Sequence, residues 1–279
     1  MGLRISTNIA AMAANRALSQ SNDEQAKHYI RLSSGNRITA AGDDAAGLSI
    51  SENLRAQIRS MAQAERNAND GISFVQVAEG GLTEIGNILI RMRELAVQAS
   101  SDTVGEKERG FIHQEVGTLL AEIDRIANVT NYNGTALLNG ESQKSELQFQ
   151  VGIRKELNDA DRIVFQPNDY NVKTNSLGVD ALNYESIDSA REAMDLVDGG
   201  IGKVFEARAR LGATQNKLHA TVNNLGIAKE TLANARSRIA DTDIASETTE
   251  LVRGQILQSA GVAVLAQANT SPMMALKLL

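Results

Sequence analysis

The sequence predicts a mainly α-helical fold: an elongated antiparallel bundle of long, heptad-patterned helices, with a small β-hairpin region and paired terminal helices. The 279 residues include only two prolines, four Tyr, five Phe and no Trp. Compact mixed folds use more proline in loops and bury more rings. Apolar residues also recur at heptad spacing through long stretches of the chain. A single helix over residues 181–239 would be about 90 Å long, so we expect a rod.

Both ends of the chain are nearly free of charge. Residues 5–22 contain one charged side chain, Arg16, and residues 254–279 contain one, Lys277. The apolar residues near the C-terminus spread around the helix instead of forming one stripe, which is typical of a helix surrounded by other helices. Within the chain the two ends have only each other. The remaining apolar surface therefore needs other copies or a partner, which suggests a self-assembling subunit.

A heptad seam predicts the second long helix. It runs from Leu54 to Ala99, and its phase slips at Gly80-Gly81. Such a slip alters the supercoil locally and need not end the helix. Asp43 is placed to cap this helix, ahead of its small residues.

A third, shorter helix carries an apolar stripe from Ile112 to Ile126. Thr103 and Glu106 have the spacing of a capping box before it. Matching stripes on three helices predict an antiparallel bundle in which each buries its stripe against the others.

Residues 140–180 depart from the helical pattern. Leu147, Phe149 and Val151 alternate with polar residues, and a second short apolar run covers 163–165. A polar stretch separates them, so we expect a β-hairpin. Pro167 marks an edge strand or its end, and Asn133-Gly134 is typical of a tight turn.

The longest seam starts at Ile187 and continues to Ile239 without a break. Twelve of its sixteen positions are apolar, whereas the 42% hydrophobic content would give about seven. The positions are Ile187, Ala190, Met194, Val197, Ile201, Val204, Arg208, Leu211, Gln215, Leu218, Val222, Leu225, Lys229, Leu232, Arg236 and Ile239.

Composition argues against most chemical functions. The net charge of -6 disfavours sequence-independent nucleic-acid binding. The absence of cysteine excludes disulfides, thiolate metal sites and cysteine nucleophiles. The three histidines are far apart. The glycine-rich stretch 199–203 does not complete a phosphate loop, because that pattern needs Gly at 197 and Ser or Thr at 204, and both positions are Val. No apolar run reaches the roughly 18 residues of a membrane span. We expect no enzyme activity, no cofactor, no metal and no membrane insertion, and no cleaved signal is visible.

Several segments in order resemble bacterial flagellin, the filament protein of the flagellum. The resemblance covers both ends and nearly the whole chain. The segments are RLSSGNRI at 31–38, DDAAG at 43–47, RNANDGIS at 66–73, RELAVQ at 93–98, ARSRI at 235–239, QILQ at 255–258 and VLAQAN at 264–269.

The resemblance implies a division of the chain into a filament core and a rod. Residues 1–43 and 240–279 would form the inner core domain around an axial channel. Residues 44–180 and the long helix 181–239 would form the rod, and the variable outer domains of other flagellins are absent. The residues expected to carry filament-core assembly are Ile5, Ile9, Leu18, Leu251, Ile256, Leu257, Val264 and Leu265.

It also implies a location and partners. Flagellins leave the cell unfolded through the flagellar export apparatus and polymerise outside the cell into the helical filament used for swimming. The implied partners are further copies of the chain, an export chaperone on about 244–279, and the filament cap and hook–filament junction proteins.

Flagellins also carry a patch that the host Toll-like receptor for flagellin recognises. The matching positions are Arg91, Leu95 and Glu115, whereas Ile90 stands where receptor-recognised flagellins commonly have Gln. The same three residues would serve lateral packing between subunits in the filament.

Three other functions remain as alternatives. A hook–filament junction protein shares the terminal segments, but such proteins usually diverge at 66–73 and 93–98, which are intact here. A flagellin with a protease in its variable insertion would need a longer insertion and an HExxH motif. A coiled-coil adaptor would not be secreted or convert from monomer to filament.

Overall fold

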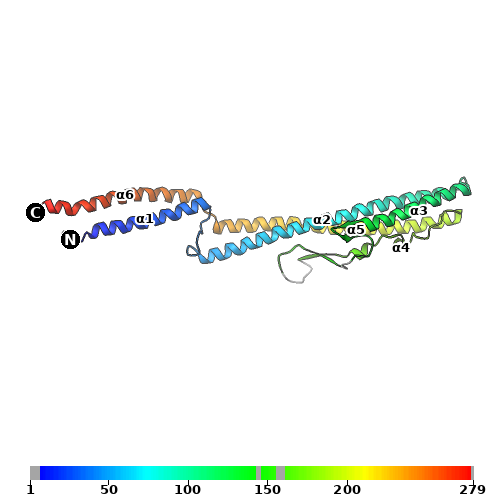
Figure 1. The fold of residues 1–279 in the computed structure, drawn as a ribbon, viewed down its shortest axis with the longest axis horizontal. Coiled ribbons are helices and arrows are strands. Elements are labelled where there is room, and N and C mark those ends of the chain that lie inside the picture. The colour runs from blue at the N-terminus through cyan, green and yellow to red at the C-terminus, as the bar shows by residue number, and fades with distance from the viewer. Residues whose placement is uncertain (1–6, 143–145, 155–160, 278–279) are drawn as a thin grey trace. The chain divides into compact units, whose positions relative to one another are not determined.

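The computed structural model describes residues 7–142, 146–154 and 161–277 (Figure 1). The chain forms two compact units, Met1–Ile58 with Glu230–Leu279, and Arg59–Lys229. The described helices are α1 (Ile9–Ser34), α2 (Ala45–Ala99), α3 (Glu106–Val129), α4 (Thr174–Leu177), α5 (Ile187–Ala240) and α6 (Ile244–Lys277). The prediction of long helices, a small β-hairpin region and paired terminal helices is confirmed.

In the unit that contains both termini, α1 and α6 lie side by side and antiparallel (Figure 1). The Asn8 side chain caps α1 by accepting a hydrogen bond from the Ala11 amide at 3.0 Å. Gly35 ends the helix with a φ of 70°, a left-handed conformation that glycine adopts without strain. Backbone bonds from Arg37 to Ala240 (2.7 Å) and from Thr242 to Gly35 (3.0 Å) then join the two chain segments that leave α1 and α5.

The expected caps of α2 and α3 are wrong in detail. Asp44, not Asp43, caps α2, because its Oδ1 accepts the Gly47 amide at 2.8 Å. Asp43 instead closes the preceding loop by accepting the amides of Thr39 and Ala40 at 3.1 and 3.2 Å, and these bonds lower the pKa of its carboxyl. Gly105 is the N-cap of α3 and provides no side-chain bond, so Thr103 and Glu106 do not form the expected capping box.

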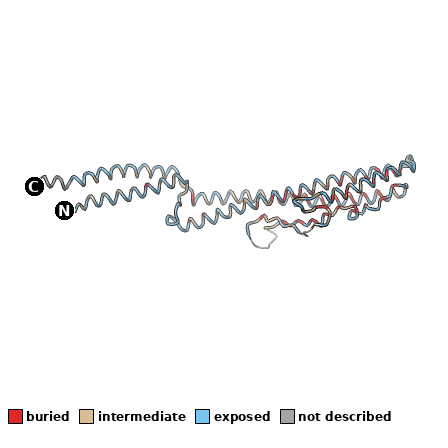
Figure 2. The backbone as a smooth tube through the Cα atoms, in the orientation of Figure 1, coloured by how far each residue is buried: buried red, intermediate tan, exposed pale blue. Residues whose placement is uncertain are grey.

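In the unit Arg59–Lys229, helices α2, α3 and α5 bury their stripes against one another (Figure 2). All sixteen seam positions beginning at Ile187 are buried or half-buried, which confirms the register read from the sequence. The slip at Gly80-Gly81 also has a packing reason. A Cβ on Gly81 would lie 2.7 Å from Cδ1 of Leu138 and 2.8 Å from Oγ1 of Thr130. Only glycine at this position therefore lets the segment 130–138, which follows α3, approach α2 so closely.

The expected β-hairpin consists of β3 (Leu147–Gln150) and β4 (Arg162–Phe165), paired antiparallel with Phe149 opposite Ile163. Part of the polar stretch between the strands lies outside the described residues. A shorter hairpin, β1 (Asn131–Tyr132) with β2 (Thr135–Ala136), is built on the expected turn, with φ values of 48° at Asn133 and 80° at Gly134. Pro167 begins the 3-10 helix η1 (Pro167–Tyr170), which follows β4 directly.

Five of the nine aromatic residues gather where the hairpins pack on α2. Phe74 makes edge-on contacts with Tyr132, Phe149 and Phe165 at centroid distances of 4.9 to 5.6 Å. Phe165 stacks on Tyr170 at 4.8 Å. The scarce rings therefore anchor the β region to the helices instead of filling the helical core.

Buried polar groups fix the ends of the helices. Arg109, which is buried on α3, donates from Nη1 to the carbonyls of Ala99 and Ser101 at 3.4 and 3.3 Å, so it satisfies carbonyls where α2 ends. The carboxylate of Asp124 accepts the backbone amide and hydroxyl of Thr174 at the start of α4, both at 2.9 Å.

Candidate assembly surfaces

Polar side chains make several of the contacts between α1 and α6. Asn8 donates to the Ala268 carbonyl, and Gln258 donates to Asn22, both at 2.9 Å. Nδ1 of His28 lies 2.6 Å from a carboxylate oxygen of Glu247. These polar contacts fix the axial register of α1 against α6.

Glycines on α6 allow the close approach. A Cβ on Gly254 would lie 2.9 Å from Cγ of Gln25, and a Cβ on Gly261 would lie 3.3 Å from Cδ1 of Leu18. Gln25 is buried, and its Nε2 has no hydrogen-bond partner among the described residues. The helices therefore pair through small and polar residues, and most of their apolar residues lie elsewhere.

Many large apolar side chains of α1 and α6 are exposed within the chain. Ile9 and Ile256 are each 64% exposed, although isoleucine is among the residues most often buried. The same outward surface includes residues that the sequence did not single out. The exposed large apolar residues of the two helices are Ile9, Met12, Tyr29, Ile30, Ile244, Val252, Ile256, Leu257, Val262 and Val264.

The predicted assembly residues thus divide into two groups. Ile9, Ile256, Leu257 and Val264 are exposed, whereas Leu18, Leu251 and Leu265 are half-buried between the helices. Ile5 lies outside the described residues. The phase of each helix relative to its half-buried residues would have identified Met12, Val252 and Val262 as further outward positions.

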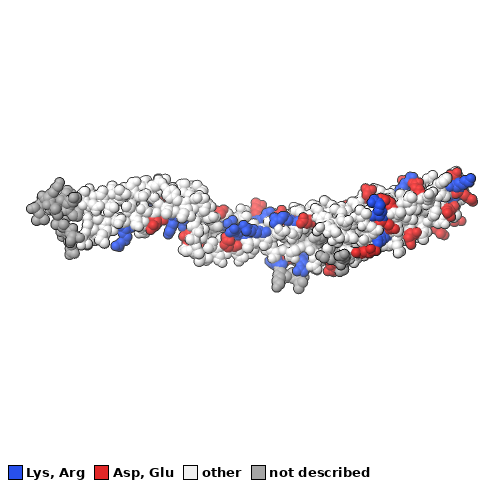
Figure 3. All heavy atoms as spheres, viewed as in Figure 1, with Lys and Arg blue, Asp and Glu red and all other residues white. Residues whose placement is uncertain are grey.

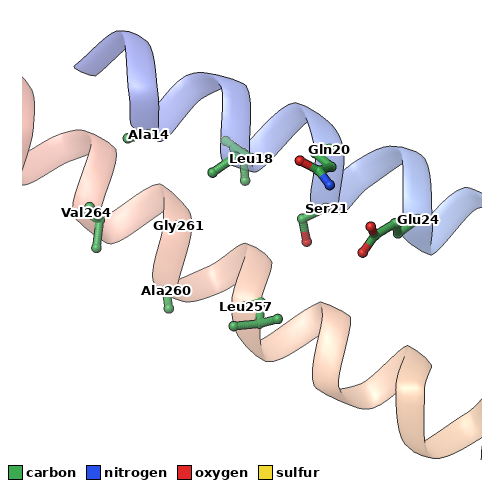
Figure 4. Close-up of a pocket in the computed structure, with 10 residues that line it drawn as sticks. Ala14, Leu18, Gln20, Ser21, Glu24, Leu257, Ala260, Gly261 and Val264 are labelled. Atoms are coloured by element: carbon green, nitrogen blue, oxygen red, sulfur yellow. The ribbon is translucent and has the colours of Figure 1, made fainter. Parts of the chain in front are cut away.

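An open groove of about 410 Å³ runs between α1 and α6 (Figure 4). Its lining is mainly apolar or small, and Glu24 is its one charged residue. The lining residues are Ala14, Ala17, Leu18, Gln20, Ser21, Glu24, Leu257, Ala260, Gly261 and Val264. On the face shown in Figure 3, charged side chains are sparse over α6. A surface with few charges and many exposed apolar side chains is typical of a site of protein–protein contact.

The unit Arg59–Lys229 brings two of the three predicted patch residues together. Arg91 on α2 donates to Glu115 on α3 and to Glu94 one turn further along α2, each at 3.1 Å. The hydrogen bonds with Glu94 and then Glu115 raise the pKa of Arg91. Leu95 is only 2% exposed and belongs to the core. The structure therefore presents Arg91 and Glu115 on the surface and places Leu95 beneath it.

Other exposed apolar residues of this unit include Ile90, Val97, Phe111 and Phe205. Of these, Phe111 on α3 is 70% exposed, and it lies one helical turn before Glu115. Composition gave no sign of these positions, because exposure depends on which side of each helix the neighbouring helices cover.

The described residues contain no group of three or more His, Asp or Glu side chains that could hold a metal ion. Among the described helices, none combines the length and hydropathy needed to cross a membrane.

Comparison with known proteins assigns the family. The pattern of the bacterial flagellin N-terminal helical region matches residues 5–143, and that of the bacterial flagellin C-terminal helical region matches residues 194–279. The chain belongs to the bacterial flagellin family. It is 42% identical over 275 residues to a flagellin of Halalkalibacterium halodurans, which covers 99% of both chains. It is 41% identical over 303 residues to a flagellin of Bacillus subtilis, covering 99% of this chain and 100% of the relative.

Solved structures agree with this assignment. The crystal structure of Bacillus cereus flagellin has a TM-score of 0.50 and 30% identity, and covers 57% of this chain and 88% of its own. A structure assigned to a flagellar hook-associated protein of Vibrio parahaemolyticus has a TM-score of 0.56 at 13% identity, and covers 71% of this chain and 100% of its own. The second likeness shows a shared fold alone, whereas the full-length identities favour a flagellin and make this chain a structural subunit of the filament.

Proposed function

We propose that this chain builds the flagellar filament by burying the outward faces of α1 and α6 against other copies. The observation that carries the proposal is the exposure of Ile9, Ile256 and Val264, which the pairing of α1 with α6 leaves largely uncovered. Removing apolar surface from water stabilises an assembly by about 25 cal/mol per Å². A contact between different faces that does not close on itself gives a helical polymer rather than a ring.

The predicted assembly residues take two roles in this mechanism. Ile9, Ile256, Leu257 and Val264 contact other copies, because they are exposed within the chain. Leu18, Leu251 and Leu265 hold α1 and α6 together, because they are half-buried in this pair of helices.

We assign Ile5 to the same assembly surface by its place in the uncharged N-terminal stretch. We keep the division that the resemblance implies, with a filament core of residues 1–43 and 240–279 and a rod of residues 44–180 and 181–239.

The exposed apolar residues of α6 also support the proposal that an export chaperone binds this helix. A helix with exposed Val252, Ile256 and Val262 aggregates unless it is covered or unfolded before assembly. The chaperone holds about 244–279 inside the cell, and the chain leaves unfolded through the export apparatus. It polymerises outside the cell between the hook–filament junction proteins and the filament cap.

Arg91 and Glu115 are the accessible part of the proposed receptor patch and lateral contact. Their exposed ion pair suits a partner that offers both a carboxylate and a donor. Leu95 supports the patch from beneath. Binding of the host Toll-like receptor for flagellin to Arg91→Ala, compared with Arg125→Ala at another exposed arginine, tests the assignment. Equal binding by both variants and the unaltered chain would contradict it.

Electron microscopy of the purified chain after addition of short filament seeds tests the assembly function. We expect long helical filaments with an axial channel. Persistent monomers at high concentration would refute self-assembly and would leave the apolar outward faces to a different partner.

A further inference from the structure

We propose that Arg16 sets the axial stagger between neighbouring copies by pairing with Glu24 in the groove of a second copy. The inference rests on the proposed function, because it names one contact through which the terminal hairpins assemble. It commits to a heterologous contact: a ridge on α1 of one copy lies in the α1–α6 groove of the next.

Arg16 is an isolated charge. Within residues 8–22 and 254–270, which we call the distal hairpin, no other Asp, Glu, Lys, Arg or His occurs. Its side chain is exposed and has no hydrogen bond or ion pair with any described residue. The carboxylates of Glu247 and Glu250, on the same unit, already pair with His28 and Arg253.

The ridge that carries Arg16 is apolar. Ile9, Met12 and Arg16 follow the spacing i, i+3, i+7, which places them on one face of α1. Ile9 and Met12 are both exposed. A contact that buries these two residues takes the guanidinium out of water with them. An unpaired buried charge is costly, so the contact needs a carboxylate from the other copy.

The groove provides that carboxylate. Glu24 is the one charged residue in its lining, and it is exposed without an ion pair among the described residues. The small side chains of Ala14, Ala17 and Ala260 in the lining leave room for a neighbouring helix to approach. A ridge with one cation among apolar residues therefore matches a groove with one anion among apolar and small residues.

The positions of the two charges imply a displacement. Arg16 and Glu24 are eight residues apart on α1, which corresponds to about 12 Å of helix. Two copies whose α1 helices run in the same direction would therefore meet staggered along the axis, not level. A stagger repeated from copy to copy generates a helical array.

Charge reversal in the full-length chain tests the pair. We would measure the critical concentration for seeded polymerisation of Arg16→Glu, of Glu24→Arg and of the double variant. Each single variant should raise it at least about tenfold, because like charges then meet in a desolvated contact. The double variant should return to within about threefold of the unaltered chain, because opposite charges meet again. Lys27→Glu, which reverses an exposed cation on α1 outside the groove lining, is the matched control and should behave like the double variant.

Mixing the two single variants makes the test specific to a contact between copies. Where the two variants alternate, the ridge of an Arg16→Glu copy lies in the groove of a Glu24→Arg copy, so a carboxylate meets a guanidinium. At the next contact the unaltered Arg16 of the second variant meets the unaltered Glu24 of the first. An equal mixture should therefore polymerise where neither variant does alone, which loss of folding within either chain cannot produce.

Three results would overturn the proposal while leaving self-assembly intact: normal polymerisation of Arg16→Glu, no rescue by the double variant or the mixture, or rescue by Asp23→Arg in place of Glu24→Arg. Failure of the unaltered chain to polymerise would instead refute the proposed function itself.

Discussion

Replacing Ile256 with Ala should weaken filament assembly without unfolding the subunit. Ile256 is 64% exposed within the chain, so most of its apolar surface is still available to be buried against other copies. Full burial of an isoleucine contributes about 1.5 to 3 kcal/mol. Alanine lacks three of the carbons of isoleucine, each of which contributes about 0.8 kcal/mol when buried, so the exposed 64% of the side chain corresponds to about 1.5 kcal/mol for each subunit added.

The assay is the critical concentration for elongation of filament seeds, measured by sedimentation. Since 1.4 kcal/mol is about a tenfold change in an equilibrium constant, we expect the critical concentration to rise about tenfold. Ser259→Ala is the control, because it alters an exposed residue one turn further along α6 and removes no apolar surface. It should leave the critical concentration within about twofold.

An unchanged critical concentration for Ile256→Ala would contradict burial of this side chain in the filament. It would mean that this face of α6 stays in water in the filament, and that the outward apolar residues do not drive assembly. Equal effects of Ile256→Ala and Ser259→Ala would lead to the same conclusion.

Other predictions concern the unit Arg59–Lys229. Gly81→Ala should lower the free energy of unfolding by about 1 to 2 kcal/mol, because overpacking against Leu138 and Thr130 outweighs the gain in helix propensity. Gly212→Ala meets no atom within 4 Å and should raise it by about 0.5 to 1 kcal/mol; opposite signs in urea unfolding would contradict this. Arg109→Ala should cost about 1 to 3 kcal/mol, because it removes the buried donor to the Ala99 carbonyl and one of the two donors to the Ser101 carbonyl, and a thermal midpoint equal to that of the unaltered chain would exclude this role. Burial raises the pKa of Tyr184 to about 12, so the unfolded chain loses this proton first, and stability should fall as the pH rises from about 10 to 12. Tyr184→Phe should flatten that part of the stability profile, and an unchanged slope would argue against it.

The sequence predicted the helical architecture well because a heptad pattern reports directly which side of a helix is buried. Every seam position from Ile187 to Ile239 avoids full exposure, including the polar members Arg208 and Lys229. These two pair with Glu79 and Glu65 on α2, so their stems lie in the seam while their charges are satisfied. The pattern therefore survives substitution by long charged residues.

Helix ends were harder to predict, because the competing signals are only one residue apart. Asp43 and Asp44 are equally good caps in sequence, and the backbone path after Thr39 decides which one meets the first turn of α2. Gly105 needs no side-chain partner to begin α3. The approach of Thr130 and Leu138 to Gly81 involves residues about fifty positions apart, which local pattern does not report.

The assembly surface was predictable as a property of the chain ends but not residue by residue. An uncharged, apolar stretch showed that α1 and α6 need covering. Which residues face outward depends on the polar and glycine contacts between the helices, such as Gly254 against Gln25. Exposure was not predictable at Leu95 either, because this position matches the receptor patch of flagellins in sequence but is buried in the structure.

The most direct test of the account is seeded polymerisation of the chain truncated after Gly254, compared with the full-length chain. Truncation removes Ile256, Leu257, Val262 and Val264 together and leaves the unit Arg59–Lys229 unaltered in sequence. We expect no filaments from the truncated chain at concentrations where the full-length chain elongates seeds, with the thermal transition of the remaining unit retained. Filaments of the truncated chain at the full-length critical concentration would contradict the claim that the terminal helices drive assembly.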